Sequence, residues 1–95
     1  MAAYVIANVT VTDPVRYEEY RKLVPGTLEK YGGEFIVRGA QIEVLEGSWR
    51  PARLVIVEFP SVEQARAWWH SPEYSEAKAL RQATSEGTLL IVQGV

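Results

Sequence analysis

Three stretches of the chain carry apolar side chains on both of the faces that a β-strand presents. In residues 3–11 alternate positions divide into two sets, with Val5, Ala7, Val9 and Val11 on one face and Tyr4, Ile6, Asn8 and Thr10 on the other. Residues 53–59 and 88–93 are equally rich in aliphatic side chains on both faces. This pattern is typical of central strands that are covered on both sides, so we predict strands in all three stretches.

A helix is predicted between the first of these strands and Gly32. Asp13 is placed to cap its N-terminus, and Pro14 suits the first helical position. Apolar residues then recur every three or four positions as one buried stripe, which consists of Tyr17, Tyr20, Val24, Leu28 and Tyr31. Pro25 has no N–H for the preceding turn, which predicts a kink near Val24. Gly32 is expected to end the helix as its C-terminal cap.

The next segment allows two interpretations. Residues 34–38 and 41–46 both alternate like strands, with Gly39 between them. Gly39 and Ala40 could form a turn between two strands, or Gly39 could be a bulge within one long, bent strand. We favour the bent strand, because residues 47–51 form a much better turn before the strand at 53–59.

Two short helices are predicted after that strand. Ser61 and Gln64 fit a capping box, so a first helix should run through Trp69. Ser71 followed by proline starts a second helix in the same way, and this helix should run to about Thr84. We expect Gly87 to end that segment before the last strand, at 88–93.

The predicted order is therefore strand, helix, strand, strand, paired helices and strand. This is the βαββαβ arrangement of ferredoxin-like α+β domains, with an antiparallel sheet and helices on one face. With 95 residues, the whole chain (1–95) is expected to form a single domain of this kind. Helices on one face would leave the apolar outer face exposed, so we expect a homodimer whose sheets pack face to face.

Composition excludes several classes of function. The formal net charge is −2 and the isoelectric point is near 5.4, so neither nucleic acid nor a membrane is an expected partner. The chain has no cysteine and only one histidine, His70. No cluster with ligand spacing is visible, so we expect no metal and no cofactor. The first residues lack a signal-peptide pattern and no apolar run reaches membrane-spanning length, so a cytoplasmic protein is expected.

Several short motifs resemble a known family. They are Tyr31-Gly32-Gly33, Arg38-Gly39, residues 46–53 (EGSWRPAR), residues 58–61 (EFPS) and residues 68–74 (WWHSPEY). Taken in order, they closely resemble the uncharacterised DUF1330 family over nearly the whole chain. That family is similar to the dimeric α/β-barrel superfamily, which includes cofactor-free monooxygenases, lactone isomerases, haem-binding enzymes and sensing domains. The resemblance thus implies a fold and a dimer, and it leaves the reaction open.

His70 and Tyr74 are the candidate catalytic residues. His70 is the one side chain whose ordinary pKa lies near neutrality, which suits a general acid or base. The structural alternative is that His70 only ends a helix, where a cation interacts favourably with the helix dipole. Tyr74 is the second candidate, because a tyrosine could assist a substrate that ionises.

Aromatic and polar residues suggest a ligand site. The candidate ligand-binding residues are Tyr4, Asn8, Tyr17, Tyr20, Arg38 and Trp68. The aromatic members could equally fill the core or a dimer interface. Asn8 lies within an otherwise apolar strand and needs a partner for its amide.

Charged residues on or beside adjacent strands allow two readings. They are Arg38, Glu43, Glu46, Arg53 and Glu58. Their ordinary explanation is cross-strand ion pairing, whereas the functional alternative is an arginine anchor for a carboxylate ligand.

Two functions of different class follow. The first is a binding module for a small, partly apolar molecule, with the dimer enclosing or flanking the pocket. The second is a cofactor-free monooxygenase or isomerase that acts on a small aromatic or lactone substrate. An assembly element without either activity is also compatible with these patterns.

Overall fold

The four strands of the chain form one antiparallel sheet. A computed structural model describes all residues, 1–95. The elements in chain order are β1 (Ala3–Val11), α1 (Pro14–Glu29), β2 (Glu34–Arg38), β3 (Leu54–Phe59), α2 (Val62–Trp69), α3 (Pro72–Thr84) and β4 (Ser85–Gln93). The strand order is β2-β3-β1-β4. The predicted α+β class and the ferredoxin-like arrangement are therefore confirmed.

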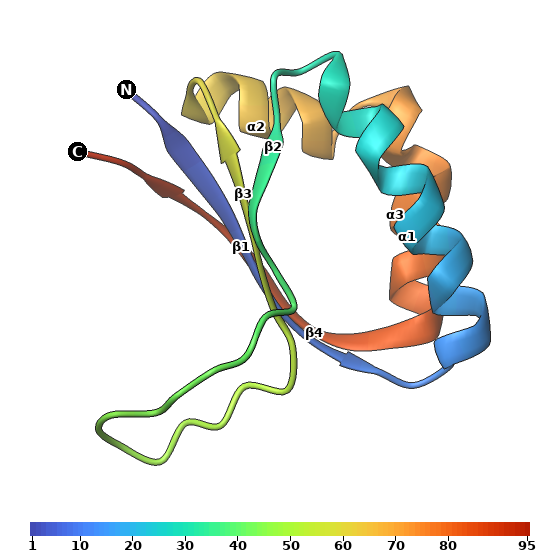
Figure 1. Cartoon of the computed structure of the whole chain (residues 1–95). Helices are drawn as coiled ribbons and strands as arrows, with labels where there is room; N and C mark the ends of the chain where they lie inside the picture. The colour runs from blue at the N-terminus through green and yellow to red at the C-terminus, as the bar shows by residue number, and fades with distance from the viewer.

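All three helices cover the same face of the sheet (Figure 1). The odd-numbered positions of β1 from Ala3 to Val9 point toward the helices and are buried. Their neighbours in the core include Phe59 from β3, Trp68 from α2 and Tyr74 from α3. Four of the five residues predicted for the α1 stripe, Tyr17, Tyr20, Val24 and Leu28, are buried in this core, whereas Tyr31 lies beyond the end of α1 and is half-buried.

The ends of α1 follow the predicted capping. Asp13 Oδ1 accepts a hydrogen bond from the backbone N–H of Arg16. At the other end Gly32 adopts φ 75°, and Gly33 N–H donates to the carbonyl oxygen of Leu28 at 3.1 Å. This is the common helix ending in which a glycine in the left-handed conformation turns the chain out of the helix. Between these ends α1 continues through Pro25 as one helix.

Pro25 leaves one backbone carbonyl of α1 without its helical partner. The missing N–H would have bonded the carbonyl oxygen of Arg21, four residues earlier. In its place a guanidinium nitrogen of Arg38 donates to that oxygen at 2.9 Å. The break in the helical hydrogen bonding thus fixes Arg38, which comes from β2, against α1.

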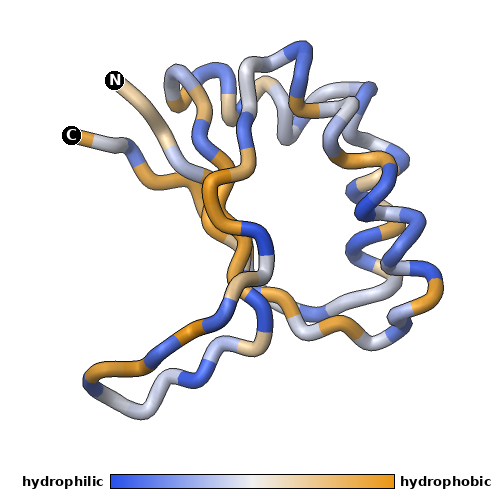
Figure 2. Tube along the Cα trace, viewed as in Figure 1, coloured by the Kyte–Doolittle hydropathy of each residue, from blue (hydrophilic) through white to orange (hydrophobic).

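The bent strand predicted over residues 34–46 is wrong. β2 ends at Arg38, and residues 39–53 form a long arm that leaves the sheet on its uncovered side (Figure 1). Gly39 turns the chain out of the sheet with φ 69°, and its N–H makes the last bond to β3, at Leu54 O. Residues 41–46 alternate like a strand, as the coloured trace shows (Figure 2). No neighbouring strand of this chain pairs with them, so the alternation has nothing to stabilise it as a strand.

The sheet does contain a bulge, but it lies three residues before Gly39. The pairing of β2 with β3 shifts between Phe35 and Val37, which leaves Ile36 as the extra residue. A bulge inverts the alternation beyond it. Phe35 therefore pairs with Val57 and Arg38 pairs with Val55, so both point to the helix-covered face.

The role predicted for Gly87 is also wrong. α3 ends at Thr84 and the chain passes directly into β4 at Ser85. The hydroxyls of Thr84 and Ser85 donate to the carbonyl oxygens of Leu80 and Arg81, which satisfies the last turn without a glycine. Gly87 lies within β4, opposite Val9, where β1 and β4 approach too closely for a side chain.

The face of the sheet opposite the helices is apolar and open. Its central positions include Ile6, Leu54, Ile56, Leu90 and Val92, which share one face by register. Leu90 and Val92 remain 45% and 43% exposed. The expectation that both faces of the sheet are apolar is thus confirmed. None of the three helices has the length and apolar character needed to cross a membrane.

Candidate functional site

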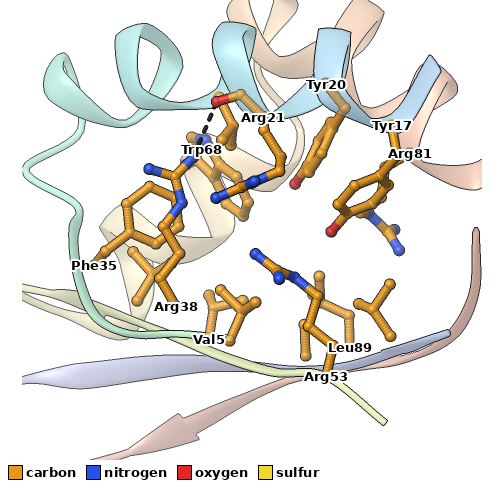
Figure 3. Close-up of a pocket in the computed structure, with 15 residues that line it drawn as sticks. Val5, Tyr17, Tyr20, Arg21, Phe35, Arg38, Arg53, Trp68, Arg81 and Leu89 are labelled. Atoms are coloured by element: carbon orange, nitrogen blue, oxygen red, sulfur yellow. Dashed lines mark hydrogen bonds between the residues drawn. The ribbon is translucent and has the colours of Figure 1, made fainter. Parts of the chain in front are cut away.

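A cavity lies between α1 and the helix-covered face of the sheet (Figure 3). The apolar part of its wall comes from all four strands, α1 and α2, and consists of Val5, Ala7, Val9, Tyr17, Tyr20, Val24, Phe35, Val55, Val57, Trp68 and Leu89. Such a wall favours the apolar part of a small molecule.

The remaining lining residues are all arginines. Arg21 comes from α1, Arg38 from β2, Arg53 from the chain just before β3, and Arg81 from α3. No aspartate or glutamate lines the cavity. Figure 3 shows these side chains reaching into the space from the sheet and from the helices. The cavity therefore combines an apolar wall with a concentration of positive charge.

Two of these arginines are held by other groups of the chain. Arg21 forms an ion pair with Glu18 at 3.0 Å on the exposed side of α1. Arg38 donates to the carbonyl oxygen of Arg21, and its guanidinium lies 4.2 Å from the ring centre of Phe35. That stacking contact is a cation–π interaction. Both side chains are thereby fixed at one side of the cavity.

A pair of tyrosines lies at the helix side of the cavity. The hydroxyl oxygens of Tyr20 and Tyr74 are 3.1 Å apart and share a hydrogen bond. Burial, with the nearby Tyr74, raises the pKa of Tyr20 far above its usual value. Tyr20 consequently keeps its proton at any physiological pH. Its hydroxyl can take part in hydrogen bonds but cannot act as a base.

Trp68 is fixed by contacts on three sides. Its ring stacks on Tyr74 with centroids 4.0 Å apart, and it also contacts Phe59. The indole N–H donates to the hydroxyl oxygen of Thr27 at 3.1 Å, and that hydroxyl donates in turn to Val24 O. The aromatic wall of the cavity is therefore a rigid surface.

The structure brings together four of the eight predicted site residues. Tyr17, Tyr20, Arg38 and Trp68 line the cavity. Tyr74 lies directly behind them and is fully buried. His70 is exposed at the C-terminal end of α2, where its backbone N–H caps the helix, and it does not line the cavity. That position matches the structural alternative for His70.

Tyr4 and Asn8 lie on the other face of the sheet. They occupy even-numbered positions of β1, and these point away from the helices. Tyr4 pairs across the strands with Glu58, whose carboxylate raises the pKa of the Tyr4 hydroxyl. Asn8 Oδ1 is shielded from solvent and accepts no hydrogen bond. Neither residue can contact a ligand in the cavity from this face.

Sequence reasoning missed Arg21 and Arg81. Arg21 has the spacing of an ordinary surface residue, so no local signal marks it. Arg81 does carry a signal, because it continues the buried stripe of α3 that contains Tyr74, Ala77 and Thr84. A charged residue within such a stripe is rarely buried unless it is paired. The cross-strand ion pairs expected for Arg38 and Arg53 do not form, since the chain's two ion pairs are Arg21–Glu18 and Lys30–Glu73.

Comparison with known proteins identifies the family. The model of a domain of unknown function, DUF1330, matches residues 2–95. This chain belongs to the DUF1330 family. No curated protein matches this DUF1330 chain in sequence. The resemblance of the short motifs in the sequence is therefore confirmed.

Solved structures share the fold of this DUF1330 chain. A Rhodopseudomonas palustris protein of unknown function has a TM-score of 0.79 and 20% identity, over 99% of this chain and 82% of its own. A dimeric ferredoxin-like protein of unknown function from Jannaschia sp. CCS1 has a TM-score of 0.70 and 18% identity, over 100% and 99%. SnoaB, a cofactor-independent oxygenase from Streptomyces nogalater, has a TM-score of 0.68 and 12% identity, over 99% and 93%. At these identities the likeness shows the fold and carries no activity across.

Proposed function

We propose that this protein binds a small, partly apolar molecule in the arginine-lined cavity, and that it does so as a homodimer. The observation that supports binding is the composition of the cavity wall. Aliphatic and aromatic side chains form most of it, and its polar groups are restricted to guanidinium and tyrosine hydroxyl groups. Binding sites for small molecules typically combine an apolar wall with a few oriented polar groups.

The same wall favours binding over base-assisted catalysis. A general base must accept a proton near neutral pH, a role that His, Asp, Glu, Lys, Cys or Tyr takes in proteins. Of these residue types only tyrosine lines the cavity, at Tyr17 and Tyr20. Tyr20 keeps its proton because its pKa is raised by burial. A reaction that begins with proton abstraction by an imidazole, carboxylate, amine or thiolate of the protein therefore has no such base in the cavity.

A cofactor-free oxygenase or isomerase is the second candidate. It is favoured by the guanidinium groups and the Tyr20 hydroxyl, which could hold the anion of a substrate that ionises without help. One variant separates the candidates. Tyr20→Phe should leave ligand binding broadly unchanged if the protein only binds. If it is an enzyme that stabilises such an anion through this hydroxyl, Tyr20→Phe should lower turnover at least about a hundredfold.

The homodimer is supported by the open face of the sheet. Leu90 and Val92 are nearly half exposed there, beside Ile6, Ile56 and Leu54. A monomer rarely leaves so continuous an apolar surface uncovered. A second copy offers an apolar face of matching shape under two-fold symmetry. Native mass spectrometry should report a dimer at micromolar concentration, and Leu90→Glu should shift it to monomer, whereas the exposed helical change Ala79→Glu should not.

Binding can be tested with a variant that fills the cavity. Ala7 lies on the floor of the cavity, whereas Ala79 is exposed on α3. Ala7→Leu should weaken binding of 2-naphthylmethanol and 2-naphthoate at least tenfold in an NMR titration, and Ala79→Leu should leave it unchanged. If neither probe binds the unaltered protein at millimolar concentration, the proposed binding function is wrong.

A further inference from the structure

Two arginines of the cavity have no partner in the chain. Arg53 and Arg81 take part in neither of the chain's ion pairs. The Nε–H groups of both are shielded from solvent and donate to no acceptor. Each of the other two lining arginines finds one acceptor, Glu18 for Arg21 and the Arg21 carbonyl oxygen for Arg38, although Arg21 Nε is also shielded without an acceptor. The unpaired positive charge is therefore concentrated on Arg53 and Arg81.

Arg81 is the more unusual of the two because it is buried. Only 8% of its surface is exposed, and its guanidinium lies 5.9 Å from the ring centre of Trp69. Burying a charged group without a counter-ion is strongly unfavourable. A position in the buried stripe of α3 would normally hold an apolar residue. The arginine is thus retained at a cost in stability.

Arg53 reaches the same region from the sheet. Its guanidinium lies 5.9 Å from the ring centre of Tyr17, and in the view of Figure 3 the guanidinium groups of Arg53 and Arg81 both appear beside this ring. Gly39 packs directly against the Arg53 guanidinium, so that any side chain at position 39 would overlap it. The absence of a side chain at position 39 leaves room for the Arg53 guanidinium in its present position.

We infer that the ligand is a small carboxylic acid with an aromatic or branched apolar body, and that Arg81 and Arg53 bind its carboxylate. This inference rests on the proposed binding function and adds the charge of the ligand to it. A carboxylate supplies the acceptors that both Nε–H groups lack, and guanidinium forks match its geometry. The apolar body then lies against Val5, Val57 and Trp68.

A matched pair of probes tests the charge requirement. 2-Naphthoate and 2-naphthylmethanol have the same ring system, and only the first is an anion. In a titration followed by ¹⁵N NMR, the acid should bind at least tenfold more tightly than the alcohol. The Nε–H resonance of Arg81 should shift with the acid and remain unchanged with the alcohol.

Arg81→Met removes the charge and keeps a similar apolar stem. It should reduce the affinity for 2-naphthoate to that for 2-naphthylmethanol, and it should raise the melting temperature, because an unpaired buried charge is lost. Arg66→Met, on the exposed side of α2, is the matched control and should change neither affinity. Arg53→Met offers an independent test of the same anchor and should also weaken binding of the acid alone.

The possible results separate this inference from the proposed function. If both probes bind the unaltered protein equally and Arg81→Met changes neither affinity, the cavity binds ligands but the carboxylate anchor is wrong. If neither probe binds at millimolar concentration, both proposals fail. A lower melting temperature for Arg81→Met, with unchanged binding, would show that Arg81 is a structural residue and would also overturn the inference.

Discussion

The contact between β1 and β4 at Gly87 makes a sharp prediction for the variant Gly87→Ala. A methyl group on residue 87 would overlap the carbonyl oxygen of Asn8, and it would lie 3.0 Å from the Asn8 carbonyl carbon and 3.1 Å from Val9 Cα. All three are backbone atoms, so no change of rotamer relieves the overlap. The two strands must separate by about 1 Å, which a close-packed interior resists.

The expected cost follows from the hydrogen bonds that this separation breaks. One or two bonds of the β1–β4 ladder would be lost at about 1–3 kcal/mol each, so we expect a loss of about 3 kcal/mol. For a domain of this size that corresponds to a fall in melting temperature of roughly 12–24 °C. Gly26→Ala is the matched control, because Gly26 is helical and no atom lies within 4 Å of a Cβ there. It should stabilise the protein by about 0.5–1 kcal/mol.

Thermal and urea unfolding followed by circular dichroism would measure both variants. The protein concentration must be held constant, because the melting temperature of the proposed dimer would depend on it. A Gly87→Ala variant that unfolds within about 1 kcal/mol of the unaltered protein would show that the two strands are not packed as closely as described.

Three further predictions concern hydrogen bonds of the helices. Thr27→Val removes the acceptor of the Trp68 indole N–H. It should lower the free energy of unfolding in urea by about 1–2 kcal/mol. Thr12→Val, at an exposed site, is the control and should lower it by less than about 0.5 kcal/mol. The Lys30 ammonium holds the pKa of Glu73 at about 2, below its usual 4.5. The free energy of unfolding should therefore fall as the pH drops from about 4.5 toward 2. In the Glu73→Gln variant, unfolding measured across this pH range should show a smaller fall. Pro25→Ala restores an N–H for the Arg21 carbonyl oxygen. In that background Arg38→Met should lower the free energy of unfolding by about 0.5–1 kcal/mol less than it does when Pro25 is present. An equal loss in both backgrounds of the double-mutant cycle would contradict this coupling.

The helices could be predicted closely because each combines a start signal with a periodic stripe. Ser61 and Ser71 cap their helices through side-chain oxygens, which accept from the backbone N–H three residues later. These local interactions depend only on neighbours in the sequence, so the starts of α2 and α3 lie where the capping residues place them. The buried face of α1 could also be predicted from the sequence alone, because residues three and four positions apart lie on one face of a helix.

The arm at residues 39–53 could not be predicted from alternation alone. A strand is stable only if another strand completes its hydrogen bonds, and that partner is not encoded in the segment itself. Ile42 and Val44 have strand-like spacing, yet Gly39 has already turned the chain away from β3. The side of each strand residue was equally uncertain past Phe35, because a bulge of one residue reverses the alternation. Register is a property of two strands, and only the structure provides it.

Three local irregularities of the chain each place or hold an arginine at the cavity. The bulge at Ile36 turns Arg38 to the helix-covered face, and the missing N–H of Pro25 leaves an acceptor that holds it there. Arg81 interrupts an otherwise apolar stripe of α3. Each irregularity costs stability by itself, through an unpaired strand residue, a broken helical bond or a buried charge. Such irregularities are expected to gather at one cavity when the residues there are selected for a binding site and not for the stability of the fold. This convergence is an argument for ligand binding that does not depend on any relative of the protein.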